Sequence, residues 1–596
     1  MTALIDYLLS KRDPDGYFAS KLSDSAISTS VALVALYLAD SQSYAKPIEK
    51  ARDWLLVHAD AAGLYGDSPE SPANLTATFL ATVALTSIGV PSERFQSARE
   101  FLDSHLGGLD FVSVRKGLLA AYGKDLTFSV PLLALATAAG FFPDADAAWR
   151  AMPRFPFEVA LLPEGLFKYL RLPVVSYAIP ALIAIGLAQL AHAGQGVISR
   201  IRGKAREKAL RVLAAKQPED GGFLEAAPLT GFVAICLSAA KLSDHPVTHR
   251  AIRFLLETQR ENGAWPIDRD LRQWVTSLAV RALAPHLDDQ EKNRFRTLLV
   301  SHQTQTLHPF TRSEPGGWAW TTHSGGVPDA DDTPAALIAL HAVGEGASTT
   351  VLAGMRWLLH LQNRDGGFPT FCKGWGKLPF DRSCPDLTAH AYRAFSLYEP
   401  LLQDSLRKQV QRAMRRCVSF LQKAQRPDGS FLPLWFGDQR AEDKSAPVYG
   451  SAVVLEHLAG ESFPFLAKAR DYLLAHQHPS GGWGSVDSET DYLCFTARCI
   501  SALAGYPDAA PALERAARFI APYIQQPETI PPEPIGLYFA HLWYSEELYA
   551  PIFLLHANQR NVMAAQAASR RLGLTGWGVC SSCAKSETRY SSTIQR

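Results

Sequence analysis

One short frame recurs along the chain and limits the folds that are open to it. The frame is Gln, then Gly four residues later, then an aromatic residue six residues after the Gln. It starts at Gln217, Gln259, Gln362, Gln425 and Gln477. Residues 12–18, "RDPDGYF", keep the frame with Arg in place of Gln, and "PGGW" ending at Trp318 is a partial copy. A frame repeated through a chain indicates a repeat architecture in which each copy belongs to one structural unit.

The segments on both sides of each copy have the periodicity of helices. "AIRFLLETQ" precedes one copy and "VTSLAVRALA" follows it, with apolar residues at helical spacing in both. The Gly residues suit a tight turn that needs positive φ. The Gln amide can hydrogen-bond the end of the next helix, while the aromatic ring packs against it. We therefore expect an all-α protein of helix pairs clamped by structural turns, and the uneven spacing favours closed α/α barrels over an open solenoid.

Composition excludes several classes of protein. A net charge of +1 with 20% charged residues gives no global field for nucleic acid. Hydrophobic content of 47% with 10% aromatic residues favours an ordered, core-rich protein. The N-terminus lacks the basic start and the cleavage site of a signal peptide, and eight cysteines in 596 residues fit a reducing compartment. Cys580 and Cys583 form one CxxC without a second Cys or His pair beside it, so a structural metal is not expected there.

Two stretches bear on membrane contact. Residues 172–190 are nearly long enough to span a bilayer, but Pro173 and Pro180 interrupt them, and a buried helix explains them equally well. Residues 197–215 place six Lys and Arg residues among apolar ones. Such a segment can lie on a membrane surface or form a solvated helix face, and the sequence leaves both open.

An acidic stretch, "PDADDTPAALIAL" from Pro328, allows three interpretations. Asp329 could cap the helix that follows, with Asp331 and Asp332 in its first turn. The carboxylates could bind a metal, although "DDQEK" at Asp288 lacks the last carboxylate of a second cluster. Three carboxyls this close cannot all ionise cheaply, so one of them could remain protonated and act as an acid. Spacing alone does not choose among these.

A resemblance to a known family bears on this choice. "PGGWAWTTHSGGVPDADDTPAAL" resembles the DxDD protonation motif and the preceding aromatic turn of squalene–hopene cyclases and related polyprenoid cyclases, and the repeated frame resembles their QW motifs. The resemblance runs from "LLSKRDPDGYF" to "IGLYFAHLWYSEELYAPIF". It looks closest to the bacterial branch that cyclises squalene and tetraprenyl-β-curcumene.

The resemblance implies roles for the acidic residues and their neighbours. Asp331 would protonate a terminal alkene, and Asp329 and Asp332 would hold it and carry the balancing charge. "CPDLTAH" matches the stretch whose histidine hydrogen-bonds the acid, which points to His390. Tyr449 in "PVYGSA" matches a tyrosine near this network.

Aromatic faces would stabilise the cation that protonation creates. By position, the resemblance gives this role to Trp320, Trp274, Trp435, Tyr177, Phe380, Phe539 and Trp543. Two features depart from the family pattern. Ser28 and Ser30 stand where hopene-forming enzymes carry glutamates, and the arginine of the "SWAR"-like stretch is missing. A different substrate or a different final step is therefore expected.

These observations lead to one main hypothesis. The chain would form two α/α barrels, with residues 1–14 packed on a catalytic barrel of residues 261–596 and a second barrel at residues 15–260. Without metal or organic cofactor, it would cyclise a linear C30–C35 isoprenoid. No nucleic-acid partner is expected, whereas peripheral attachment to the cytoplasmic side of a membrane and a homodimer are candidates. The alternatives are a zinc prenyltransferase-like barrel, a glycoside hydrolase barrel and a non-catalytic lipid-binding barrel.

Overall fold

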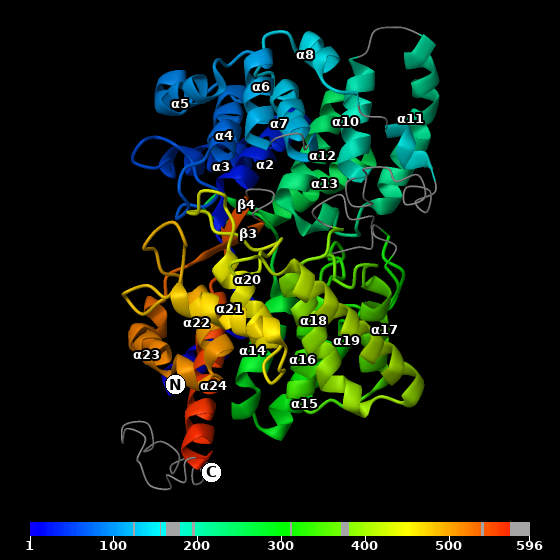
Figure 1. Ribbon diagram of the computed structural model, residues 1–596. Coiled ribbons are helices and arrows are strands. Elements are labelled where there is room, and N and C mark those ends of the chain that lie inside the picture. The colour runs from blue at the N-terminus through cyan, green and yellow to red at the C-terminus, as the bar shows by residue number, and fades with distance from the viewer. Residues whose placement is uncertain are drawn as a thin grey trace, which may run out of the picture.

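The computed structural model describes residues 1–122, 126–154, 157–162, 179–192, 197–309, 313–370, 381–537 and 542–571. Helices dominate these residues, and they gather into two bodies, one above the other (Figure 1). The all-α fold with two α/α barrels is confirmed. Tyr177, Phe380, Phe539, Cys580 and Cys583 lie outside the described residues.

The C-terminal barrel, in the lower half of Figure 1, has six inner helices in a closed ring. These are α14 (Arg272–Leu283), α16 (Asp332–Ala342), α18 (Pro385–Tyr398), α20 (Pro447–His457), α22 (Leu493–Leu503) and α24 (Tyr549–Arg571). Each contacts the next, and α24 contacts α14. The outer helices are α15 (Asp289–Ser301), α17 (Thr349–Leu361), α19 (Asp404–Ala424), α21 (Pro464–Ala475), α23 (Ala510–Gln525) and α1 (Thr2–Ser10). Helix α1 packs on α23 and α24, so both ends of the chain contribute to this barrel.

The N-terminal barrel has an inner layer in which α12 (Ala227–Ala239) contacts three other helices. Those are α2 (Ala26–Asp40), α7 (Leu126–Ala138) and α10 (Ile179–Ala191), and α4 (Leu75–Ser87) contacts both α2 and α7. The outer helices are α3 (Ala45–Val57), α5 (Gln96–Leu106), α6 (Phe111–Tyr122), α8 (Ala145–Ala151), α11 (Val197–Lys216) and α13 (Pro246–Thr258).

Short 3₁₀ helices occur in both halves of the chain. They are η1 (Ser92–Phe95), η2 (Phe157–Leu161), η4 (Phe223–Glu225), η5 (Ala284–His286), η6 (Glu399–Leu401), η7 (Pro507–Ala509) and η8 (Pro527–Thr529).

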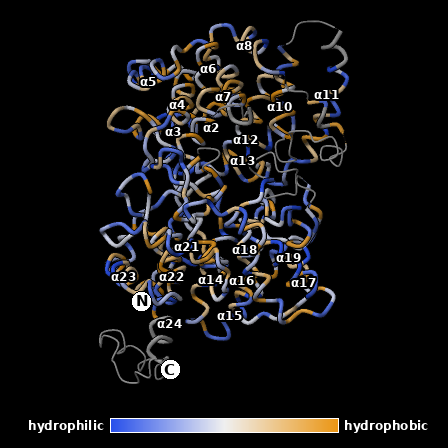
Figure 2. Tube along the Cα trace, viewed as in Figure 1, coloured by the Kyte–Doolittle hydropathy of each residue, from blue (hydrophilic) through white to orange (hydrophobic). Residues whose placement is uncertain are grey.

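The two layers differ in sequence because they differ in burial. Inner helices are covered on both sides, so α16 is buried at every residue from Asp332 to Leu340. Outer helices bury one face only, and α19 buries Val410, Ala413, Cys417 and Leu421 at helical spacing. Figure 2 shows the same contrast in the N-terminal barrel, with hydrophobic tube at α7 and α10 and hydrophilic stretches at α5 and α11. The buried residues form two apolar cores, one in each barrel.

The repeated turns clamp the inner layer to the outer layer. In each of the five copies, the Gln side-chain Nε2 donates to the carbonyl of the first Gly of its own turn at 2.9–3.1 Å. It also donates to a carbonyl of an outer helix at 2.8–3.0 Å. These first Gly residues have φ of 91–97°, and a Cβ on Gly366 would lie 2.4 Å from the Arg416 carbonyl oxygen. The predicted role of the Gln amides is confirmed.

Short strands join the two barrels. Strand β1 (Asp24–Ser25) pairs antiparallel with β2 (Trp265–Pro266), where the chain passes from one barrel to the other. Strands β3 (Pro534–Leu537) and β4 (Leu542–Ser545) form an antiparallel pair between the barrels (Figure 1). In the described part of the chain, no helix is long and apolar enough to cross a membrane.

Candidate active site

The turn before α16 fixes the position of the acidic stretch. The Trp318 backbone N–H donates to Thr333 Oγ1 at 3.0 Å, and the Asp329 N–H donates to the Trp318 carbonyl at 3.2 Å. Asp329 Oδ1 accepts the N–H groups of Asp331 at 2.8 Å and of Asp332 at 2.7 Å. Asp329 therefore caps the start of α16 from two residues before the N-cap position, which is Asp331 and not Asp329; the side chain of Asp331 makes no capping hydrogen bond, and only Asp332 lies in the first turn.

Asp331 faces a histidine from the neighbouring inner helix. Its Oδ1 lies 2.6 Å from His390 Nδ1, a contact between α16 and α18. The side chain of His390 is 6% exposed, and that of Asp331 is 23% exposed. Asp331 is thus the least buried carboxyl of the three, because Asp329 and Asp332 are both buried.

The two flanking carboxyls are buried beside each other. Burial raises the pKa of Asp329 to about 6, and hydrogen bonds from Asp332 oppose this shift. Burial first, and then the charge of Asp329, raise the pKa of Asp332 well above its usual range. Asp332 Oδ1 has no hydrogen-bond partner within the described ranges. Burial and the closeness of the two carboxyls therefore both disfavour full ionisation of the pair.

Further ionisable side chains gather around Asp331. Asp386, four residues before His390 on α18, has a pKa raised to about 6 by burial and also by the charge of Asp331. Burial raises the pKa of Tyr449, which is on α20. The same holds for Tyr544 on β4, and Asp331 contributes to both shifts. Three elements, α18, α20 and β4, thus bring titratable groups to Asp331.

Aromatic residues from several elements pack together around the start of α14. The Trp320 carbonyl accepts the N–H groups of Gln273 and Trp274 at 3.0 and 3.1 Å, so both tryptophans meet at the start of α14. The Trp274 ring stacks on Phe436 at 5.9 Å and meets Tyr549 edge-on at 4.7 Å.

Trp435 and Trp543, the other two described tryptophans that were expected to stabilise a cation, lie on different elements. Trp435 is half-buried on the loop before α20, packed against the apolar core of the C-terminal barrel. Trp543 is buried on β4, and its backbone N–H donates to Asp67 Oδ2 of the N-terminal barrel at 2.7 Å.

Sequence families match both halves of this architecture. The family described as Squalene-hopene cyclase C-terminal domain matches residues 273–504, and the family described as Squalene-hopene cyclase N-terminal domain matches residues 1–131. Together the two matches cover more than half of the chain. The chain belongs to the squalene–hopene cyclase family.

Individual members and relatives of the squalene–hopene cyclase family are similar at low identity. The chain is 25% identical over 597 residues to a terpene cyclase–glycosyl transferase fusion protein of Humicola fuscoatra, covering 80% of this chain and 42% of that protein. It is 24% identical over 579 residues to a probable squalene–hopene cyclase of Sinorhizobium fredii, covering 81% and 82%. It is 31% identical over 263 residues to a drimenyl diphosphate synthase of Streptomyces showdoensis, covering 41% and 44%. The chain therefore spans less than half the length of the first of these proteins.

The sequence analysis did not identify several of the groups that lie around Asp331. Asp386 is one turn from His390 on the same helix face, a spacing that could have revealed it. Tyr544 and Tyr549 stand in the quoted "LWYSEELYAPIF", but spacing along a loop gives no direction for a side chain. The buried hydroxyl of Tyr549 has no hydrogen-bond partner among the residues that the structure describes.

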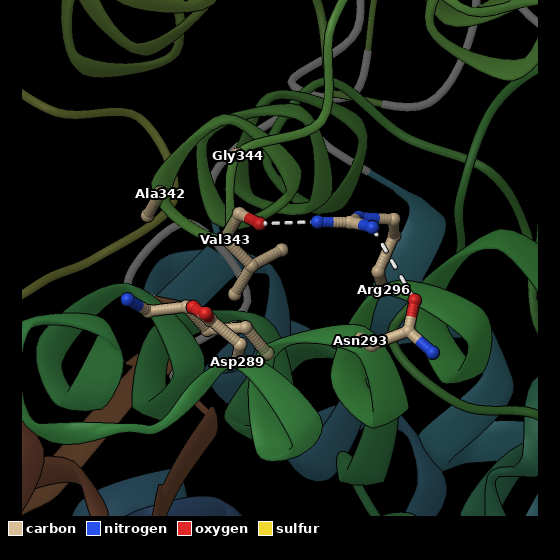
Figure 3. A pocket seen from close by; sticks show the side chains of 7 residues that line it. Asp289, Asn293, Arg296, Ala342, Val343 and Gly344 are labelled. Atoms are coloured by element: carbon tan, nitrogen blue, oxygen red, sulfur yellow. Dashed lines mark hydrogen bonds between the residues drawn. The ribbon is translucent and has the colours of Figure 1, made fainter.

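A surface pocket lies away from the acid. It has a volume of about 480 Å³ and lies where α15 meets the end of α16, lined by Asp289, Lys292, Asn293, Arg296, Ala342, Val343 and Gly344 (Figure 3). Arg296 donates to the Val343 carbonyl at 2.8 Å and to Asn293 Oδ1 at 3.3 Å. Helix α16 has 11 residues, so this pocket is separated from Asp331 by about 16 Å of helix.

The structure also bears on where a metal could bind. In the described ranges, no group of three or more His, Cys, Asp and Glu side chains has the arrangement of a metal site. The cysteine pair at 580 and 583 lies outside those ranges.

Proposed function

We propose that this protein cyclises a linear isoprenoid by protonating a terminal double bond with Asp331. The single observation that supports this most is the 2.6 Å contact between Asp331 and His390 at the start of α16. A carboxyl that is bound on one oxygen by an imidazole can carry its proton on the other oxygen. The partial exposure of the Asp331 side chain leaves it accessible to a substrate.

The proposed reaction needs only a proton and a shaped apolar site. The Asp331 proton moves to the less substituted CH carbon of the terminal double bond, and the π electrons of that bond form the new C–H bond, so that the cation is tertiary. The adjacent carbon becomes cationic, and the next double bonds attack in turn to close rings. A proton lost at the end, or water added with loss of a proton, completes the reaction. Asp331 is reprotonated before the next turnover, with His390 as its partner in the proposal.

The neighbouring carboxyls and rings fit this chemistry. Asp329 accepts the backbone N–H of Asp331, and we propose that Asp329 and Asp332 together carry the balancing charge. Aromatic faces stabilise a desolvated cation by roughly 0.5–2 kcal/mol each without trapping it. Trp274 and Trp320, whose backbones are hydrogen-bonded at the start of α14, are proposed for this role, together with Trp435 and Trp543. Tyr449 is proposed as a member of the acid network.

We propose a C30–C35 hydrocarbon such as squalene or tetraprenyl-β-curcumene as the substrate. The support is the similarity to a probable squalene–hopene cyclase over most of both chains. The final step is proposed to differ from hopene formation. Ser28 and Ser30 are both buried at the start of α2, where Ser30 Oγ donates to the Ala26 carbonyl at 2.6 Å. Neither side chain carries a carboxylate that could organise a terminating water.

The proposal extends to domains and location. Residues 261–596 with residues 1–14 would form the catalytic barrel, and residues 15–260 would close the substrate site. Because the substrate is apolar, we propose peripheral attachment to the cytoplasmic side of a membrane, with a homodimer as the assembly. Recovery of all activity in the soluble fraction without detergent would count against attachment. Sedimentation of a monomer at working concentration would count against the dimer.

Incubation with defined substrates tests the proposed reaction. The purified protein is incubated separately with squalene, tetraprenyl-β-curcumene and a linear prenyl diphosphate, and the products are analysed by mass spectrometry. Cyclic products with the mass of a hydrocarbon substrate, or with one added water, support the proposal. Product from the diphosphate alone would favour a drimenyl diphosphate synthase-like activity instead.

Two variants assign the acid. Asp331→Asn cannot donate the proton and is expected to reduce product formation at least a hundredfold. Asp289→Asn serves as the matched control, because Asp289 is exposed and lies in the pocket beyond the far end of α16. Equal product yields from wild type and Asp331→Asn would remove Asp331 from the mechanism. Zinc in the purified protein that is required for activity would favour a prenyltransferase-like barrel.

A further inference from the structure

A buried cluster of charged residues crosses the C-terminal barrel beside the acid. Its centre is Glu456 on α20, whose side chain has no solvent exposure. Arg281 Nη2 on α14 donates to Glu456 Oε1 at 2.7 Å, and Arg498 Nη1 on α22 donates to Oε2 at 2.9 Å. His556 on α24 lies 3.4 Å from the same carboxylate. Four of the six inner helices thus meet at one carboxylate.

This cluster carries more positive than negative charge. The two guanidiniums face one carboxylate, and they hold the pKa of Glu456 well below its usual range against the effect of burial. Burial lowers the pKa of His556 to about 4, so it is neutral at pH 7. One excess positive charge therefore remains inside the barrel, where low polarity makes it act over a longer range than in water.

Arg498 is the part of the cluster that lies next to the acid network. Its guanidinium carbon is 5.8 Å from the centre of the Tyr449 ring and 4.1 Å from that of Phe553. Burial opposes its charged form, while the charge of Glu456 and, more weakly, that of Asp331 favour it. The cluster reaches the acid by a second route as well, because His457, next to Glu456, stacks on His390 at 4.5 Å.

We propose that Arg498 is a positioning residue for the acid, and that its guanidinium, fixed by Glu456, stabilises the carboxylate that Asp331 becomes when it gives up its proton. This inference rests on the proposed function. A positive charge beside the acid favours proton release, because it lowers the energy of the deprotonated form. Glu456 keeps the guanidinium in place, and the rings of Tyr449 and Phe553 cover its face.

Other charged and titratable groups also face this site and must be considered in any pH dependence. They are Glu456 and His457 on α20, Arg281 on α14, His556 and Arg560 on α24, Arg393 on α18 and Cys494 on α22. Burial and the charge of His390 keep the pKa of His457 well below its usual range, and burial raises that of Cys494. His457, His556 and Cys494 therefore stay uncharged near pH 7.

The test compares Arg498→Met with Arg281→Met in a cyclisation assay across pH. Each variant removes one guanidinium from Glu456, but in the described structure only Arg498 covers Tyr449. For Arg498→Met we expect kcat to fall about threefold to tenfold with KM unchanged. We also expect the alkaline limb of the pH–rate profile to move up by about half to one pH unit, because the initiating group holds its proton more tightly. The limb of Arg281→Met should move by less than half as much.

A conservative variant and a neutral hydrogen-bonding variant complete the design. Arg498→Lys keeps the charge and is expected to keep the limb near its wild-type position, even if kcat falls. Arg498→Gln removes the charge but keeps an amide that can donate to Glu456, which also retains Arg281, and it is used if Arg498→Met does not fold. It should show the same upward movement of the limb as Arg498→Met.

The results separate this inference from the proposed function. An unmoved limb in both Arg498→Met and Arg498→Gln overturns the inference, and so do equal movements in Arg498→Met and Arg281→Met. A lower rate with an unmoved limb identifies a structural role only and also overturns it. Absence of any cyclic product from the wild-type protein refutes the proposed function instead, because the Arg498 comparison needs an active enzyme.

Discussion

The cap at Asp329 allows a sharp test of how the start of α16 is stabilised. Its Oδ1 accepts two backbone N–H groups, from Asp331 and Asp332, at 2.8 and 2.7 Å in a buried setting. Asp329→Ala leaves both donors without a partner. A buried unpaired donor costs about 1–3 kcal/mol, and loss of an N-cap costs about 0.5–2 kcal/mol. We therefore expect Asp329→Ala to lower the free energy of unfolding by about 2–4 kcal/mol.

Asp329→Asn is the matched control for this test. Its side-chain carbonyl can accept the same two N–H groups, so the cap is kept while the charge is removed. We expect its free energy of unfolding to lie within about 1 kcal/mol of wild type at pH 5. Urea-induced unfolding, followed by circular dichroism, measures both variants. Equal destabilisation by Ala and Asn would refute the cap, because the charge alone would then account for the effect.

The same pair of variants has a defined pH dependence. Burial raises the folded-state pKa of Asp329 from 3.8 to about 6. Because this pKa is higher in the folded state than in the unfolded state, the contribution of Asp329 to the free energy of unfolding is full below about pH 4 and is lost as the pH rises through about 6. Asp329→Asn cannot ionise, so it should lose less stability than wild type between pH 4 and pH 7. A steeper loss in Asp329→Asn would show that the sign of this effect is wrong.

Three more outcomes follow from the contacts of other residues. His390→Ala is expected to reduce kcat about a hundredfold, and adding it to Asp331→Asn should cause little further loss of kcat. If the steady-state losses of the two single variants multiply in the double variant, the two residues act separately. Burial raises the pKa of Glu225 to about 9, so its contribution to the free energy of unfolding is full below about pH 4.5 and is lost as the pH rises to about 9. Glu225→Gln should therefore make the thermal unfolding temperature fall less with pH than in wild type, and parallel curves for the two proteins would contradict this. Gln362→Leu removes the donor of two buried carbonyls and should cost about 2–4 kcal/mol in urea unfolding, and a change below about 0.5 kcal/mol would mean that the turn is not a clamp.

The repeated turns could be predicted from the sequence because all their parts are close together in the chain. Gln, Gly and the aromatic residue lie within seven positions, so one quoted frame specifies the hydrogen bonds that form. The copy before the acid was recognised only in part. There Gln303 takes the role of the frame's Gln and donates to the Gly316 and Thr350 carbonyls at 2.8 Å each. Twelve residues, instead of the three of the other copies, separate Gln303 from Gly316 and hide the frame.

The charged cluster beside the acid could not be predicted in the same way. Arg281 and Glu456 are 175 residues apart, and Glu456 and Arg498 are 42 residues apart. Their contacts depend on how three inner helices face one another, which local periodicity does not define. The sequence contains one indication of this cluster, because "LAVRALA" and "FTARCIS" each place a single arginine, Arg281 or Arg498, among apolar helical residues. A lone charge in a buried helix needs a partner, but the sequence does not name that partner.

The three aspartates of the acidic stretch differ in what their surroundings leave them able to do. Asp329 uses one oxygen on two backbone N–H groups, which fixes it as the cap of α16. Asp332 is the first residue of that helix, buried beside Asp329, and burial disfavours its charged form. Asp331 is the one that both contacts a histidine and retains partial exposure. Cap and acid were alternatives while only the spacing was known, because each could explain the whole stretch. In the folded chain they are compatible, since the cap holds the backbone of the residue proposed as the acid.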